Sequence, residues 1–179
     1  MKYVAFLRAI NVGGHTVKMD HLRSLFESMD FTNVETFIAS GNVIFDSKSK
    51  GSASLEKKIE KQLQKSFGYE VKTFIRTLDE IAGVIRNSGF TTAELERSGN
   101  ILYIGFMSET PEASAIQKLM ALTDDVNDCH VGEREVYWLR RTAVGESQYS
   151  GGIIEKILGT PITFRNSTTV KKILAKYAR

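Results

Sequence analysis

The order of apolar and polar positions in the first 76 residues predicts two strand–helix–strand segments in succession. Positions 3–7 are apolar without interruption, which favours a central strand covered on both faces. Two later segments have apolar residues every three or four positions, as in amphipathic helices, and a glycine-containing turn between strand-like runs predicts a hairpin. In order, the predicted elements are strand 3–7, helix 19–29, strands 34–39 and 43–47, helix 55–67 closed by Gly68, and strand 69–75.

The same order of elements returns after residue 100. The predicted elements are strand 101–107, a helix opened by Thr110–Pro111, hairpin strands 125–131 and 135–141 around Gly132, a helix over 153–158 closed by Gly159, and strand 161–164. Between the repeats, Thr77 and Glu80 predict a capping box for a connecting helix, and residues 90–99 are predicted to be a linker. An amphipathic helix over 170–177 ends the chain.

Two βαββαβ repeats predict an α+β protein with two tandem ferredoxin-like halves, a connecting helix and a C-terminal helix. The repeat is inferred from the order of elements, because the two halves share little sequence identity. The predicted division is a first half over residues 1–76, a connecting helix and linker over 77–99, and a second half with the C-terminal helix over 100–179.

The predicted topology brings two distant motifs together. In a ferredoxin-like sheet the first two strands are parallel and the third runs back, so the end of the first strand lies beside the turn between the second and third. The motif RAINVGG at 8–14 follows the first strand, and SGN at 40–42 is that turn. The residues expected to cluster at this edge are Arg8, Asn11, Gly13, Gly14, Ser40, Gly41 and Asn42.

Two interpretations of this cluster stay open. In the structural one, Gly13 and Gly14 provide positive φ angles for a tight turn, Ser-Gly-Asn is ordinary hairpin chemistry, and Arg8 bonds backbone carbonyls. In the functional one, the glycines let the backbone approach a ligand, amide N–H groups face it, and Arg8 binds an anion through two parallel hydrogen bonds. Neither GxGxxG nor GxxxxGK followed by Ser or Thr is present, so no nucleotide fingerprint supports the functional interpretation.

The segment TFRNSTTV at 163–170 contains a second candidate site. Arg165 and Asn166 follow a predicted strand, and Ser167 or Thr168 is placed to cap the last helix. Capping alone explains this pattern. A helix N-terminus beside an arginine is also suited to an anion, so Arg165 and Asn166 are candidate ligand-binding residues as well.

Strand direction predicts where this second candidate lies. The fourth strand of a ferredoxin-like half runs antiparallel to the first, so Arg165 and Asn166 lie away from the turn at Gly132 in their own half. If they are functional, we expect them to face a cleft between the halves, near Arg8 and Asn11.

Composition and charge limit the classes of function. The chain has 179 residues, 42% hydrophobic and 25% charged, which is typical of globular proteins. Its net charge of +3 is too small by itself to indicate a nucleic-acid partner. No apolar run approaches the roughly 18 residues of a membrane span, and the apolar start is too short for a signal peptide. We therefore predict a cytoplasmic protein without a membrane partner.

Few side chains have the spacing that metal binding or catalysis requires. The three histidines lack metal-ligand spacing, and Ser-Gly-Asn has no recognisable His and Asp partners, so neither a metal, a cofactor nor a hydrolase triad is predicted. Cys129, the single cysteine, lies in an apolar stretch and is expected to be a buried thiol. Arg140 and Arg141 are expected to be exposed at a strand end, and the Lys- and Glu-rich positions 56–65 to form a solvated helix face.

The chain resembles the bacterial domain-of-unknown-function 1697 family in three stretches that span nearly its whole length: LRAINVGG with KMDHLR, TFIASGNVIF, and TFRNSTTVKKILAKYA. The family pattern is Leu-Arg-Gly/Ala-Ile-Asn-Val-Gly-Gly, then Ser-Gly-Asn-Val, then Arg-Asn-Trp-Asn-Thr. The third motif departs here, because Ser167 and Thr168 stand where the Trp and Asn usually are. If that Trp stacks on a ligand in the family, this chain lacks the ring that the ligand would stack on. The resemblance implies an α+β fold with two related halves, leaves open an exchange of their first strands, and implies no established activity.

These observations lead to a hypothesis of function: a bacterial binding module for a phosphate-bearing ligand, either an anionic small molecule such as a nucleotide or a nucleic acid. Two alternatives stay open, namely an enzyme that acts on a small polar metabolite in the same pocket, and a protein that dimerises through exposed sheet edges. RNA recognition motifs share the element order. The third strand here has a single aromatic residue, Phe45, and lacks their basic signature, so we expect no sequence-specific RNA binding through the first sheet. The oligomeric state is not predicted.

Overall fold

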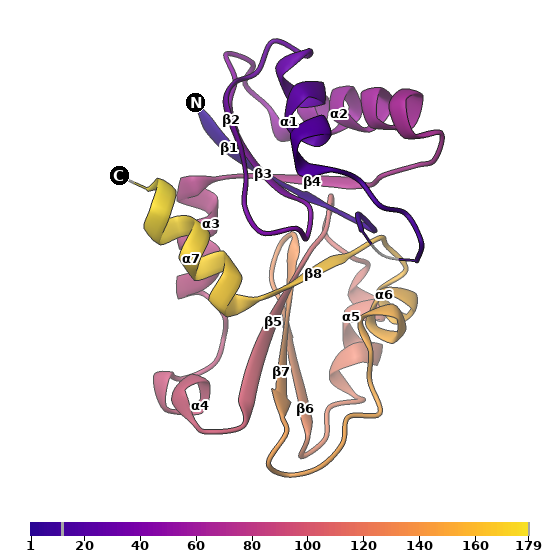
Figure 1. Cartoon of the computed structure of the whole chain (residues 1–179). Coiled ribbons are helices and arrows are strands. Elements are labelled where there is room, and N and C mark those ends of the chain that lie inside the picture. Colours follow the sequence, from indigo (N-terminus) through magenta and orange to yellow (C-terminus); the bar gives the residue numbers. More distant parts are fainter. Residues whose placement is uncertain (12, 179) are drawn as a thin grey trace. The chain divides into compact units, whose positions relative to one another are not determined.

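The structure is a computed structural model that describes residues 1–11 and 13–178. The chain divides into two compact units, Met1–Ile81 and Ala82–Arg179, and each contains a four-stranded antiparallel sheet (Figure 1). The division falls within helix α3 (Leu78–Arg86), so the segment 77–99 is shared between the two units. Val12 of the RAINVGG motif lies outside the described residues.

The first unit has the order of elements that its apolar pattern predicts. They are β1 (Lys2–Leu7), α1 (Met19–Glu27), β2 (Thr32–Thr36), β3 (Asn42–Asp46), α2 (Ser52–Phe67) and β4 (Thr73–Thr77), followed by the start of α3. The sheet order is β2-β3-β1-β4 with antiparallel neighbours, which is the ferredoxin-like arrangement. Residues 3–7 of β1 are buried between two neighbouring strands, so the predicted central strand is confirmed.

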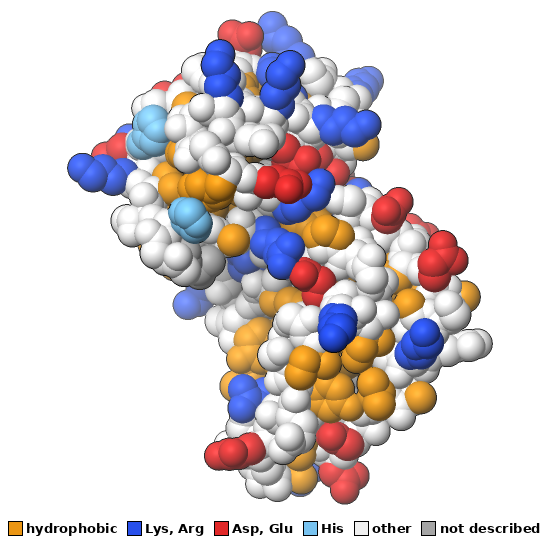
Figure 2. Space-filling view, turned by 90° about the vertical axis from the view of Figure 1, so that its right-hand side faces the viewer, with side chains coloured by type: hydrophobic (Ala, Val, Ile, Leu, Met, Phe, Trp, Pro, Cys, Tyr) orange, Lys and Arg blue, Asp and Glu red, His pale blue; other side chains and the backbone are white. Residues whose placement is uncertain are grey.

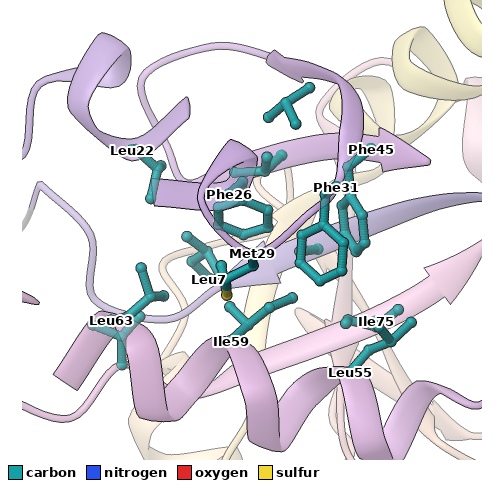
Figure 3. Packing of buried hydrophobic residues seen from close by; sticks show 14 of the residues in the cluster. Leu7, Leu22, Phe26, Met29, Phe31, Phe45, Leu55, Ile59, Leu63 and Ile75 are labelled. Carbon is teal, nitrogen blue, oxygen red and sulfur yellow. The ribbon is translucent and has the colours of Figure 1, made fainter. Parts of the chain in front are cut away.

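Helices α1 and α2 pack their apolar stripes on one face of this sheet (Figure 3). The buried residues of the two stripes are Leu22, Phe26, Leu55, Ile59 and Leu63. The ring of Phe26 meets that of Phe45 edge to face, with centroids 5.5 Å apart. Burying one side chain of this size contributes about 1.5–3 kcal/mol. Helix α2 ends at Gly68, whose φ of 78° is the left-handed C-terminal cap expected from the sequence.

Several strand boundaries of the first unit differ from the predicted ones, two of them by three or four residues. β2 ends at Thr36 rather than at residue 39, two residues before Ile38, whose φ of 59° lies in the left-handed region. β4 begins at Thr73 rather than at residue 69. The connection between β2 and β3 therefore spans residues 37–41 and is longer than the predicted Ser-Gly-Asn turn.

The second unit repeats the arrangement of the first. Its elements are α4 (Thr92–Glu96), β5 (Asn100–Phe106), α5 (Ala113–Met120), β6 (Asn127–Val131), β7 (Glu135–Arg141), α6 (Gly151–Leu158), β8 (Thr163–Asn166) and α7 (Ser167–Tyr177). The sheet order β6-β7-β5-β8 corresponds strand by strand to β2-β3-β1-β4. The fold is thus α+β with two tandem ferredoxin-like halves. Each sheet contains its own first strand, so the exchange of first strands does not occur.

The second unit also corrects two predictions. The segment predicted as a linker contains α4, which begins with a capping box: the Thr91 side chain accepts from Glu94 N, and the Glu94 carboxylate accepts from Thr91 N. The last strand extends to Asn166, so Arg165 and Asn166 belong to β8 instead of following it. Within the described part of the chain, no helix has both the length and the apolar character needed to cross a membrane. The cytoplasmic location stays a prediction.

Glutamates of α2 and α6, the second helices of the two βαββαβ repeats, accept hydrogen bonds from amides in or just before the fourth strand. The Glu56 carboxylate accepts from Ile75 N at 2.8 Å, and the Glu60 carboxylate from Thr73 N at 3.0 Å. In the second unit, Glu155 of α6 accepts from the amide of Ile162, just before β8, at 2.8 Å. Glu56 is buried, so the solvated helix face predicted for positions 56–65 is wrong at this position. These bonds satisfy strand amides that would otherwise be open to another chain.

The first testable prediction concerns Glu56. Glu56→Ala leaves the amide of Ile75 without its acceptor, so we expect the free energy of unfolding in urea to fall by about 1.5–3 kcal/mol. Glu56→Gln keeps an acceptor oxygen and should lose less. Lys57→Ala, on the exposed side of the same helix, is the matched control, with an effect within about 0.5 kcal/mol. Hydrogen exchange of the Ile75 amide should accelerate in Glu56→Ala, and unchanged exchange would contradict the assignment.

Candidate functional site

The loop after β1 and the turn between β2 and β3 lie side by side at one edge of the first sheet. Leu7 N donates to Gly41 O at 2.8 Å, and Asn11 Nδ2 donates to Ala39 O at 3.1 Å. A Cβ at Gly41 would stand 3.1 Å from the Cβ of Ile10. The predicted meeting of RAINVGG and SGN is therefore confirmed, while ligand binding by these residues stays a prediction.

Two asparagines of the predicted site hold this pair of loops in shape. Asn11 bridges the loops, because its Nδ2 bonds Ala39 O while its Oδ1 accepts from Val17 N at 2.6 Å. Asn42 is fully buried, and its Nδ2 donates to Phe37 O at 3.0 Å and to Ser40 Oγ at 2.9 Å. The amide groups of both side chains are thus engaged inside the protein, and both residues are positioning residues for the edge.

The backbone of the loop after β1 alternates between left-handed and ordinary conformations. Ala9 and Asn11 have φ values of 59° and 57°, whereas Arg8 and Ile10 do not have positive φ. Gly13 and Gly14 are also left-handed, at 62° and 86°, and both are exposed. Alternating right-handed and left-handed residues form the anion-binding concavity called a nest, and the change of φ sign along residues 8–11 resembles that pattern. The N–H of Arg8 itself bonds Lys72 O.

The facing turn contains a strained residue. Ile38 is β-branched, has a φ of 59°, and its side chain is 55% exposed, so burial of the side chain does not compensate for the unfavourable backbone. A non-glycine residue held in this region costs about 1–3 kcal/mol and persists only where its surroundings impose it. Here the bonds of Asn11 to Ala39 O and of Phe37 N to Asn42 O fix the turn on both sides of Ile38.

Arg8 and Ser40 provide the polar side chains of the edge. Arg8 is half-buried, and its backbone N–H donates to Lys72 O at 2.8 Å, which fixes the start of the loop against the residue before β4. Arg8 also takes part in a further interaction within the protein, which a bound ligand would have to accommodate. Ser40 is exposed, and its hydroxyl accepts from Asn42.

Four rings beside this edge were not indicated by the sequence. They form an aromatic strip of the first unit, which we define as His15, Tyr69, Phe67 and His21. Ring centroids are 4.0 Å apart between His15 and Tyr69, 5.8 Å between Tyr69 and Phe67, and 5.9 Å between Phe67 and His21. Figure 2 shows two histidine side chains on either side of an apolar patch in its upper part. The available signal was the position of His15 directly after Gly14.

The second candidate motif forms a small pocket in the second unit. Asn166, and not Ser167 or Thr168, is the N-cap of α7, with its side chain accepting from Thr168 N at 2.9 Å. The pocket has a volume of about 170 Å³, and its walls among the described residues are Leu95, Asn100, Ile101, Leu102, Asn166, Ser167, Thr168 and Lys171. Arg165 is not among them.

Arg165 is engaged within its own strand. Its guanidinium donates to Thr163 Oγ1 at 2.8 Å and to Phe164 O at 2.9 Å. Burial lowers the pKa of Arg165 to about 10, so the side chain is still charged at neutral pH. Arg8 and Arg165 belong to different units, and the geometry within each unit does not test a shared anion site, which stays a prediction.

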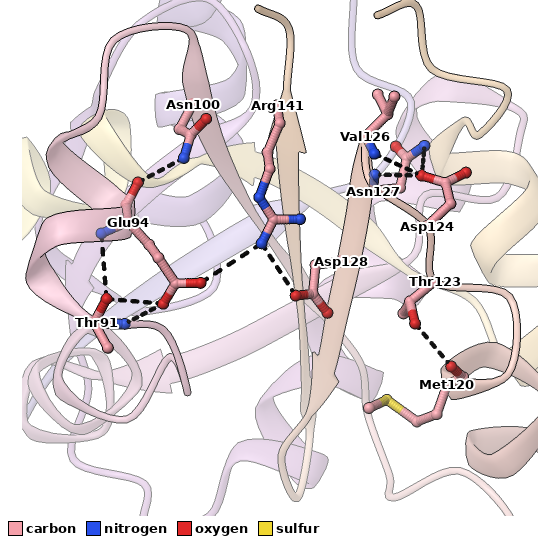
Figure 4. Close-up of polar contacts among 10 residues, drawn as sticks. All are labelled: Thr91, Glu94, Asn100, Met120, Thr123, Asp124, Val126, Asn127, Asp128 and Arg141. Carbon is pink, nitrogen blue, oxygen red and sulfur yellow. Dashed lines mark hydrogen bonds and ion pairs between the residues drawn. The ribbon is translucent and has the colours of Figure 1, made fainter. Parts of the chain in front are cut away.

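The paired arginines at the end of β7 do not form an exposed basic surface. Arg141 is half-buried and lies 3.2 Å from Asp128 Oδ2 and 3.5 Å from Glu94 Oε1 (Figure 4). Hydrogen bonds from Thr91, and more weakly the charge of Arg141, hold the pKa of Glu94 below its usual value. Arg140 is half-buried as well, so the predicted exposure of both residues is wrong.

Cys129 is a buried thiol, as the sequence predicts. It is 3% exposed, and burial, with smaller contributions from the charges of Asp128 and Asp124, raises its pKa to about 12. A thiol with such a pKa is a poor nucleophile at neutral pH. Within residues 1–11 and 13–178, no three His, Cys, Asp or Glu side chains are grouped so that they could hold a metal ion.

A family model described as "Protein of unknown function (DUF1697)" matches residues 1–137, which is more than half of the chain. The chain belongs to the DUF1697 family. The matched region contains both loops of the edge in the first unit and ends before the segment 163–170, where the sequence departs from the family pattern.

The solved structure of the conserved bacterial protein SP0830 from Streptococcus pneumoniae has the same fold as this DUF1697 chain. The TM-score is 0.73 at 22% sequence identity, and the match covers 97% of each chain. At this identity the likeness concerns the fold alone. A search of curated proteins found no match.

The second testable prediction uses the glycines of the edge. Gly41→Ala combines an unfavourable φ of 75° with contacts of 3.1–3.2 Å to Ile10 and Leu7, so we expect the free energy of unfolding to fall by about 2–4 kcal/mol. Gly13→Ala and Gly14→Ala are matched controls, because nothing lies within 4 Å of their added Cβ atoms, and they should lose only about 1–2 kcal/mol. If Gly41→Ala and the two controls lose the same free energy of unfolding in urea, the close approach of the two loops is not what disfavours a side chain at position 41.

The third testable prediction concerns Cys129. With a pKa of about 12, about one thiol in ten thousand is ionised at pH 8, so iodoacetamide should label the folded protein very slowly and the urea-unfolded protein quickly, as measured by mass spectrometry. The unfolded thiol ionises near pH 8.5. Above that value the unfolded state binds fewer protons than the folded state, so this contribution to stability declines as the pH rises toward 12. Rapid labelling of the folded protein at pH 8 would contradict the assignment.

Proposed function

We propose that the first unit binds a phosphate-bearing ligand at the edge formed by the loop 8–14 and the turn 37–41. The observation that carries this proposal is the alternation of φ sign along Arg8–Asn11, a pattern that resembles anion-binding nests, in a loop that begins at an arginine. A guanidinium binds phosphate oxygens through parallel hydrogen bonds, which gives both affinity and orientation. The DUF1697 match contains this whole edge but does not bear on its ligand.

Strain in the edge supports the proposal. A loop with only a connecting role can avoid left-handed alanine and isoleucine, whereas Ala9 and Ile38 both adopt positive φ here. Strained residues of this kind are concentrated where a shape is needed for binding. The bonds of Asn11 hold the two loops together without a ligand. Binding therefore does not cost the conformational entropy of ordering the backbone.

The two alternatives receive less support from the described residues. For an enzyme, Cys129 is buried with a raised pKa, and the hydroxyl–imidazole pair of Ser66 Oγ and His21 Nε2, 3.4 Å apart, is exposed and outside the proposed anion site. For dimerisation through sheet edges, both edges of the first sheet have features that oppose pairing. The amides of β4 are covered by Glu56 and Glu60, and the register of β2 shifts between Thr32 and Glu35.

The fourth testable prediction uses inorganic pyrophosphate as the probe and isothermal titration calorimetry of the full chain. Arg8→Ala removes the charged hydrogen bonds proposed for the anion, which are together worth about 1.5–3 kcal/mol, and should weaken binding about tenfold to a hundredfold. Arg8→Lys keeps the charge but loses the paired geometry, and should give an intermediate affinity.

Arg86→Ala provides the control, because Arg86 is an exposed arginine at the end of α3 and belongs to the second unit. Its affinity for pyrophosphate should stay within about twofold of the unmodified protein, which separates a local contact from the effect of net charge. Unchanged binding in Arg8→Ala, or an equal loss in Arg86→Ala, would refute the proposed site.

A further inference from the structure

We propose that the His15 end of the aromatic strip receives the base of a nucleotide, with the base stacked on His15 and the phosphates on the neighbouring loop; His21, at the other end beside Phe67, does not take part. This inference rests on the proposed anion site and names the ligand class. The strip combines residues from three segments: the end of the loop after β1, helix α1, and the exit of α2. Rings from separate segments that contact one another in series form a surface suited to a flat aromatic molecule.

The support of the strip is rigid and its outer ring is accessible. Phe67 and Tyr69 pack against the hydrophobic core of the first unit, and both are half-buried. His15 is exposed and lies over Tyr69, with ring centroids 4.0 Å apart and planes inclined by 31°. One face of the imidazole is therefore supported by a ring fixed on the core. The exposure of His15 leaves room for a base to stack on it.

The proposed stacking position adjoins the proposed phosphate position. His15 directly follows Gly14, and consecutive Cα atoms are about 3.8 Å apart. Nothing lies within 4 Å of a Cβ built on Gly13 or Gly14, so the backbone beside the ring is open to a ligand. A single small molecule can therefore contact the loop through its phosphates and His15 through its base.

Tyr69 adds a polar feature to the strip. Its hydroxyl oxygen is buried and has no hydrogen-bond partner among the described residues. A buried hydroxyl without a partner is unfavourable, and native structures usually pair such a group with protein, water or ligand. A nucleotide carries ring nitrogens, exocyclic groups and ribose hydroxyls, which are groups able to form such a bond.

The position of the strip separates this inference from RNA recognition. Modules that read RNA with this element order stack bases on aromatic residues in the middle of the sheet. Here the rings lie beside the ends of the strands, next to a loop with the shape for one anionic group. We therefore assign the strip to a mononucleotide, and nucleic-acid binding through the sheet face is not part of the proposal.

The fifth testable prediction compares ADP, pyrophosphate and adenosine by titration calorimetry of the full chain. ADP should bind more tightly than pyrophosphate, and adenosine should bind more weakly than ADP. His15→Ala should weaken ADP binding by about fivefold to a hundredfold, the range for loss of one stacked base, and leave pyrophosphate within about twofold. His15→Phe keeps a ring for stacking and should retain most of the affinity for ADP.

His21→Ala is the matched control, because His21 is an exposed histidine at the other end of the strip, beside Phe67. It should leave the affinity for ADP within about twofold. Equal affinities for ADP and pyrophosphate, or no effect of His15→Ala on ADP, would overturn the stacking of a base and leave the anion site intact. Absence of binding by both ADP and pyrophosphate would overturn the anion site and this inference together.

Discussion

The antiparallel pairing of β1 with β3 and β4 is the constraint on which the candidate site depends. Because β1 lies between them, its last residue reaches the turn that precedes β3, and Leu7 N bonds Gly41 O. Arg8 N then bonds Lys72 O beside β4. The three chain segments at this edge are thus fixed by backbone bonds before any side chain of the loop contributes. Apolar residues on β1 stabilise the pairing, since residues 3–7 are buried.

The edge gives up local stability for a defined shape. Left-handed conformations at Ala9 and Ile38 cost free energy, and the bonds of Asn11 and the core beneath the loops offset that cost. Such an arrangement holds backbone groups and Arg8 in one geometry. Preorganisation lowers the loss of conformational entropy on binding, which is the property that the proposed function needs.

The two units solve the problem of open strand edges in the same way, although their sequences differ. In each unit a glutamate from the second helix accepts a hydrogen bond from an amide in or just before the fourth strand, Glu56 in the first and Glu155 in the second. A carboxylate at this place satisfies a backbone donor and discourages pairing with another chain. The two bonds do not have the same register, because Ile75 lies inside β4 and Ile162 precedes β8. What the units share is the chemistry of the contact and not its position.

The sequence by itself determined the order of elements apart from α4, the central position of β1, the buried thiol of Cys129, and the meeting of RAINVGG with SGN. Each of these follows from periodic apolar positions, from glycine, or from the fixed directions of strands in one topology. Tertiary structure alone decided that Glu56 is buried, that Arg141 is paired with Glu94 and Asp128, and that His15 stacks on Tyr69. The two ion pairs of Arg141 and the ring contact of His15 join side chains that are separated by 13 to 54 positions in the chain. Local propensity does not specify such partners, because a charged or aromatic side chain has many possible partners of similar energy until packing fixes its neighbours.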